Sequence, residues 1–261
     1  MVINIIKNMY YKSIKEDLTS TAGELAFRIL LSMPPIVIFI TTIIGTLNLK
    51  HVIIEMYIIP GVSDLINTLI YETGQTPTGS VIVFTLVFTF ISSTSAFKAV
   101  IKSVNKAHAI TDNRSFIKKI LLSAGLMLIF CLATIIFLIV WVFGGTIFDF
   151  FHEIFGLSLP FLTGFFPTIV SVFVMFIAIS LIYKLSLVSK TKIWAGALFT
   201  VILIILATEG FRIFISINTS MSVIYGSLMG ILVLIIWVYL ISMSLMLGNI
   251  LNAVLNENNK G

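Results

Sequence analysis

Two ionisable residues inside an apolar segment are the first candidates for chemistry. Glu209 and Arg212 lie in segment 193–217, three residues apart, so they are neighbours on one face of a helix. An ionisable side chain within a membrane-spanning segment is costly and marks a candidate path for an ion or a solute. A self-contained ion pair near the membrane interface is the alternative interpretation. We expect both side chains to face the interior of a helix bundle and to pair with each other.

A run of hydroxyl side chains is the second candidate. Ser92, Ser93, Thr94 and Ser95 follow one another in the apolar segment 79–101. Such groups either bond to the carbonyl groups of their own helix or point into a hydrated cavity. In the second case the three serines would join the ion pair in one polar intramembrane site. Their depth along the segment places them nearer the inner half of the membrane, so the Glu–Arg pairing is the firmer expectation.

The patterns that carry catalysis in soluble enzymes are missing from the sequence. It contains no phosphate-binding loop, no GxSxG or HExxH motif and no Cys/His cluster. Asp149, His152 and Glu153 could in principle hold a metal, but their spacing matches no ligand pattern, and His51 and His108 lie in other loops. We therefore predict no catalytic residue, no metal site, no cofactor and a protein that is not an enzyme.

Long apolar segments must position these residues. The 261-residue chain is 59% hydrophobic and 10% charged, with a mean hydropathy of +1.14, whereas soluble domains carry about 25% charged residues. A membrane-spanning helix needs about 20 apolar residues. Six segments satisfy this length, namely 25–47, 79–101, 120–143, 161–183, 193–217 and 223–249. The sequence predicts an all-α polytopic membrane protein with six transmembrane helices.

The remaining segments complete the predicted organisation. Residues 1–24 mix lysines with apolar residues and predict an amphipathic helix on the cytoplasmic surface. The six-span membrane domain covers 25–253, and 254–261 forms a polar cytoplasmic tail. The longest loop, 48–78, is expected to hold short interfacial helices, and a second outer loop is expected at 144–160.

The distribution of positive charge predicts the orientation. Thirteen Lys and Arg residues, including Lys98 near the inner end of 79–101, lie on one side of the predicted membrane domain and Lys50 alone on the other. This asymmetry predicts that both termini lie in the cytoplasm. This also explains the basic pI near 9.3 without a nucleic-acid partner. Lys98, Lys102 and Lys106 recur every four residues, so they could bind anionic lipid headgroups, a role compatible with setting the topology.

A stripe of small residues follows one face of the last span. Gly226, Gly230, Trp237, Gly248 and Asn252 share this face, and the two first glycines form a GxxxG pair. Small residues let helix backbones approach closely in a membrane. A packing seam within the bundle, a homo-oligomer seam and a substrate path all remain open.

Three stretches together resemble the YihY/BrkB family of bacterial inner-membrane proteins. LAFRILLSMPP at 25–35, which ends in Pro35, looks like the family pattern LAFY-x-LLS followed by proline. The segment 92–106 with Asn105, followed by Arg114, is similar to the family's second span and basic loop. The family's C-terminal signature YGS-x-x-G…W…LG-x-E-x-NA is matched by Tyr225, Gly226, Gly230, Trp237, Gly248 and Asn252.

The resemblance implies a six-helix fold without an established activity, and some members carry the label ribonuclease BN. Two positions depart from the pattern: Arg28 stands where the family has tyrosine, and Ile250 where the signature has glutamate. Arg28 follows Glu24 by four residues, so these two can pair along the helix. RNA hydrolysis finds no support, because no clustered carboxylates or histidines could hold a metal that activates water.

Two functions remain open at this point. The first is a transporter or flippase for a small or lipid-like solute, indicated by the Pro34-Pro35 kink expected in the first span, the hydroxyl run and the Glu209–Arg212 pair. The second is a non-transporting envelope scaffold that binds a membrane partner through its glycine-rich seam. No internal repeat is visible, which weakens the analogy with inverted-repeat carriers.

Overall fold

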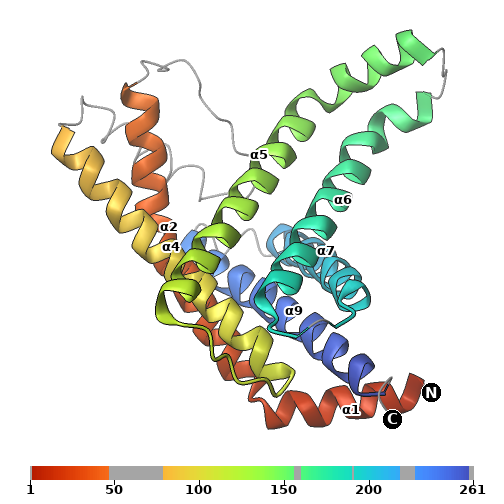
Figure 1. Ribbon diagram of the computed structural model, residues 1–261. Helices are drawn as coiled ribbons and strands as arrows, with labels where there is room; N and C mark the ends of the chain where they lie inside the picture. Colours follow the sequence, from red (N-terminus) through yellow and green to blue (C-terminus); the bar gives the residue numbers. More distant parts are fainter. Residues whose placement is uncertain (1, 47–78, 156–159, 190, 218–226, 259–261) are drawn as a thin grey trace. The chain divides into compact units, whose positions relative to one another are not determined.

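The computed structural model describes residues 2–46, 79–155, 160–189, 191–217 and 227–258, and this part of the chain is all-α (Figure 1). It forms seven helices and no strand. The helices are α1 Val2–Lys15, α2 Leu18–Thr46, α4 Gly79–Ala107, α5 Phe116–Phe155, α6 Pro160–Ser186, α7 Trp194–Ile217 and α9 Ser227–Asn258. The short helices predicted within 48–78, and the motif residues Tyr225 and Gly226, lie outside the described residues.

Four of the described helices are long and apolar enough to cross a membrane. They supply the stretches Phe116–Phe137, Pro167–Ser186, Trp194–Ile217 and Gly230–Asn258, which coincide with the third to sixth predicted spans. Many apolar side chains on these helices are more than half exposed, among them Leu128, Phe130 and Leu132 on α5. Such a surface is favourable only in apolar surroundings, as expected for a membrane protein.

The first two predicted spans, 25–47 and 79–101, fall in α2 and α4. Each is one helix of 29 residues, or about 43 Å at the α-helical rise. α2 continues through Pro34 and Pro35, so the two prolines do not end the helix. Part of each helix lies outside the residues whose side chains the structure describes.

Two helix boundaries differ from the prediction. α5 continues to Phe155, although an outer loop was expected from residue 144, because no proline interrupts the segment and aromatic residues continue its apolar character. α9 reaches Asn258, well into the predicted tail 254–261. There Asn256 exchanges two hydrogen bonds with the backbone of Lys192, which holds the end of the helix in place.

The chain divides into two compact units. Unit one comprises Met1–Ser13, Ile101–Ile202 and Leu247–Gly261, and unit two comprises Ile14–Val100 and Leu203–Met246. In unit one α5 packs against α6, and Leu126, Tyr183 and Val201 are fully buried. In unit two Phe211 on α7 and Val233 on α9 form a core cluster. Each candidate site described below lies within one unit.

Candidate functional site

The Glu209–Arg212 pair forms on α7, as its spacing predicts. Arg212 donates from Nε to Glu209 Oε2 over 2.8 Å, and its Nη2 lies 2.8 Å from the same oxygen. The side chains are 54% and 74% exposed, respectively. They do not face the interior of unit two, contrary to the expectation, because Phe211 occupies the buried face of α7 and packs with Val233. Positions 209 and 212 consequently point away from that core.

The hydroxyl groups of the run on α4 have different surroundings. Thr94 donates to the carbonyl groups of Phe90 and Ile91 on its own helix, at 2.8 and 3.0 Å. Ser93 is buried, and its Oγ has no hydrogen-bond partner among the described residues. Ser95 instead accepts a hydrogen bond from another helix. The run therefore mixes structural and unsatisfied hydroxyl groups.

The partner of Ser95 is Arg28, which α2 supplies within the same unit. Arg28 Nη1 donates to Ser95 Oγ over 2.8 Å. Its Nη2 and Nε donate to Glu24 Oε1, one helical turn earlier, over 3.0 and 3.2 Å. The two charged side chains are 38% and 42% exposed. We call Glu24, Arg28 and Ser95 the Arg28 cluster.

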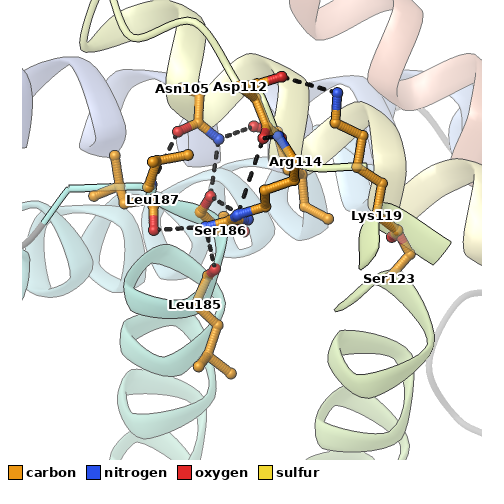
Figure 2. Close-up of polar contacts among 10 residues, drawn as sticks. Asn105, Asp112, Arg114, Lys119, Ser123, Leu185, Ser186 and Leu187 are labelled. Atoms are coloured by element: carbon orange, nitrogen blue, oxygen red, sulfur yellow. Dashed lines mark hydrogen bonds and ion pairs between the residues drawn. The ribbon is translucent and has the colours of Figure 1, made fainter. Parts of the chain in front are cut away.

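A second polar cluster holds the end of α6 in unit one, where Figure 2 shows its residues converging. Asn105, near the end of α4, is almost fully buried. Its Nδ2 donates to the carbonyl groups of Ser186 and of Ile101 on its own helix, both over 2.8 Å. Its Oδ1 accepts from the amide of Val188 over 3.1 Å. One amide group thereby satisfies backbone groups on both sides of the α6 terminus.

Arg114 completes this second cluster (Figure 2). Its guanidinium donates to the carbonyl groups of Leu187, over 2.9 Å, and Ser186, over 3.2 Å. Asp112 orients the arginine by accepting from its backbone amide, and Lys119 donates to the Asp112 carbonyl, each over 3.0 Å. A cation is favourable at a helix C-terminus, where unpaired carbonyl groups gather. Asn105 and Arg114 therefore act together as a cap of α6.

α7 and α9 approach each other closely in unit one. The amide of Gly196 donates to Asn252 Oδ1 over 2.7 Å. A Cβ atom added at Gly248 would lie 1.8 Å from Thr200 Oγ1 and 2.5 Å from the Gly196 carbonyl oxygen. Thr200 also hydrogen-bonds the hydroxyl group of buried Tyr183 on α6, over 2.7 Å. This part of the small-residue stripe is thus a packing seam within the chain.

Both polar clusters and the glycine contact lie within the part of the chain that one family profile covers. The profile described as Virulence factor BrkB matches residues 9–261. The chain belongs to the BrkB family. It is also 28% identical over 267 residues to the ribonuclease-like protein YfkH of Bacillus subtilis (strain 168), covering 99% of this chain and 97% of that protein. No solved structure matches the chain.

The other motif positions of this BrkB chain have structural placements. Pro35 lies inside α2, and Gly230 is buried on α9. Trp237 packs against the Phe211–Val233 cluster, and its Nε1 lies 3.4 Å from Thr208 Oγ1. The Trp237 side chain therefore contributes to helix packing in unit two.

The three lysines of α4 lie near its C-terminal end. Lys102 and Lys106 are exposed, while Lys98 is half-buried, and each takes part in an interaction. No group of three or more His, Cys, Asp or Glu side chains that could hold a metal occurs within the described ranges. The lysines thus offer positive charge at one end of a candidate span.

The Arg28 cluster has the strongest capacity for recognition. A guanidinium carries five N–H donors, and Glu24 and Ser95 accept from three nitrogen atoms of Arg28 in the described structure. This leaves two N–H groups, on Nη1 and Nη2, for a further acceptor. Guanidinium groups match carboxylate and phosphate oxygens in geometry and charge. The cluster can therefore hold an anionic group.

The positions of Arg28 and Ser95 along their predicted spans indicate this contact in the sequence. Arg28 lies three residues from the inner end of the predicted span 25–47, and Ser95 lies six residues from the inner end of 79–101. Two residues at similar depth on neighbouring spans can meet. Glu209, in contrast, was placed in the outer half of its span, too far along to reach the hydroxyl run.

Proposed function

We propose that this BrkB-family chain is a six-span protein of the bacterial plasma membrane, with both termini in the cytoplasm, that moves a small or lipid-like solute. Four described helices long enough to span and the 29-residue α2 and α4 support the number of spans. The excess of Lys and Arg on one side supports the orientation. The predicted division into a surface segment, a membrane domain and a tail is retained, with α9 extending into the tail.

The observation that carries the transport proposal is the Arg28 cluster. Ionisable side chains are expensive inside a membrane and are kept where they face a bundle interior or a hydrated path. Here a guanidinium within a predicted span pairs with Glu24, and Ser95 holds it from a second helix. Ser93, on the same helix but on another face, is a buried hydroxyl group that has no hydrogen-bond partner among the described residues. We infer that the solute carries an anionic group, in particular a phosphate, that binds to Arg28.

The Glu209–Arg212 pair is the second candidate site of the same path. Each charge already has its partner on α7, and both side chains are largely exposed. Exposed ion pairs contribute little to stability, and among the described residues no hydrogen bond from another helix holds this pair. We therefore assign it a smaller role than the Arg28 cluster.

Two further parts of the proposal concern partners and chemistry. Anionic lipid headgroups are the proposed partners of Lys98, Lys102 and Lys106, at the inner end of α4, and a homo-oligomer is a candidate assembly. Hydrolysis of RNA is not part of the proposal, since the sequence offers no cluster of acidic or histidine side chains for it.

The decisive experiment is a flux assay with the purified protein in proteoliposomes. Two probes separate a lipid headgroup from a free anion: fluorescent phosphatidylglycerol, whose transfer dithionite quenching reports, and inorganic phosphate. We expect faster movement of one probe than in protein-free vesicles. Arg28→Gln should slow that movement by about tenfold or more, because a hydrogen bond to a charged group contributes about 1.5–3 kcal/mol. Movement of neither probe above the protein-free rate would overturn the proposal in favour of the scaffold function.

A further inference from the structure

α1 carries an apolar stripe that the protein does not cover. Ile3, Ile6, Tyr10 and Ile14 are separated by three, four and four residues, which places them on one face of the helix. Their exposed fractions lie between 61% and 80%. A neighbouring face carries Asn4, Lys7, Asn8 and Lys15, all exposed. α1 therefore presents an apolar and a basic polar surface side by side.

A third face of α1 is the one turned toward the protein. Ile5, Met9 and Ser13 on this face are half-buried. Lys12 shares the face, is 11% exposed, and forms an ion pair with Glu257 in the last turn of α9. This contact fixes the rotation of the helix about its axis within unit one. The apolar stripe is consequently directed away from the rest of the unit.

The chain connection places α1 at the membrane surface. Only Glu16 and Asp17 separate it from α2, and Asp17 adopts a left-handed φ of 50°, which interrupts the helix between α1 and α2. α2 begins at Leu18, seven residues or about 10 Å before the predicted span at Leu25. The C-terminal end of α1 therefore lies within reach of the headgroup layer.

We propose that α1 lies in the inner membrane interface, with Ile3, Ile6, Tyr10 and Ile14 inserted among anionic lipids and Lys7 and Lys15 toward their headgroups. The chemistry is that of an interfacial helix, in which an apolar face enters the boundary of the acyl chains and lysines add attraction to negative lipids. A protein partner fits less well, since standard interfaces use about 20–30 residues a side and this stripe offers four. This inference does not depend on transport.

Depth-dependent fluorescence of the full-length protein in vesicles tests the proposal. With Cys131→Ser as background, an environment-sensitive dye is attached at Ile6→Cys or at the matched polar-face position Asn8→Cys. In vesicles of phosphatidylcholine with phosphatidylglycerol, we expect blue-shifted emission and quenching by spin-labelled lipid chains for position 6, and neither for position 8. Tyr10→Cys should repeat the result of position 6, which guards against a local effect of one label.

Changing the lipid composition tests whether anionic lipids or a second copy of the chain cover the apolar stripe. Replacing phosphatidylglycerol by phosphatidylcholine should reduce quenching at position 6, and Lys7→Gln with Lys15→Gln should remove most of that dependence, on the order of fivefold in partitioning per lysine. Equal emission at positions 6 and 8 would overturn the proposal. So would close label-to-label contact at position 6 between copies, measured by spin–spin broadening, because it would show that a second copy covers the stripe.

Discussion

Two Glu–Arg pairs in unit two have nearly the same sequence pattern and different surroundings. Glu24 and Arg28 are four residues apart on α2, and Glu209 and Arg212 are three apart on α7. Both pairs form. Only Arg28 is also held by another helix, through Ser95, and Arg28 is 38% exposed against 74% for Arg212. Spacing along one helix thus predicts an ion pair, while the neighbouring helix decides whether it becomes part of a site.

The largest loss of stability is expected at the close contact between α7 and α9, because this contact holds α7 in place. Gly248→Leu should strongly destabilise the protein, since even a Cβ atom there would overlap Thr200 Oγ1 and the Gly196 backbone, and overpacking typically costs about 1–3 kcal/mol or more. Loss of the folded monodisperse peak in detergent, or a large fall in Tm, would show it.

Gly210→Leu is the matched control for this prediction. Gly210 lies on α7 between the two charged residues, and a Cβ atom there would meet nothing within 4 Å. We expect its Tm to stay near that of the wild type, because the residue adds helix propensity without a clash. Equal losses at positions 210 and 248 would contradict the close contact between α7 and α9.

Replacing each arginine separately compares how much the two Glu–Arg pairs contribute to stability. Arg28→Leu removes a partner from both Glu24 and Ser95, whereas Arg212→Leu removes a partner from exposed Glu209 alone. The Tm should therefore fall more for Arg28→Leu than for Arg212→Leu, as thermal unfolding followed by fluorescence would reveal. A larger fall for Arg212→Leu would reverse the assignment of the two sites.

Removal of one hydroxyl group is expected to have the smallest effect. Ser95→Ala deletes the acceptor of Arg28 Nη1 and should cost about 0.5–1.5 kcal/mol of unfolding free energy, the usual net contribution of one hydrogen bond. Ser92→Ala, three residues earlier in the same run, serves as control and should leave stability unchanged. If the two variants behave alike in denaturant unfolding, Ser95 does not join the helices.

The helices and the family could be predicted from the sequence because long apolar segments and short motifs are local properties. The predicted spans at 120–143 and 161–183 fall inside α5 and α6, and the span at 193–217 begins one residue before α7. The length of a membrane span does not fix where α5 ends, because a helix can continue beyond the span, as α5 does to Phe155. Likewise the capping role of Asn105 and Arg114 requires knowing that α6 ends beside them.

The candidate site was predicted only in part, for a related reason. The sequence predicts the Glu–Arg pairs and the hydroxyl run, and the structure adds the contact between Ser95 and Arg28. That contact depends on the depth that Arg28 and Ser95 share on two different helices, which spacing along one helix does not contain. Which face of α7 is buried depends on Phe211 meeting Val233 across helices, and no spacing rule within α7 contains that information.

The most direct test of the central claim compares flux through Arg28→Gln and Arg212→Gln in proteoliposomes, using whichever probe the wild-type protein moves and equal amounts of folded protein. If the Arg28 cluster recognises the solute, Arg28→Gln should lose about tenfold or more of the rate, while Arg212→Gln should keep most of it. A rate that falls with Arg212→Gln and stays at the wild-type level with Arg28→Gln would contradict the account.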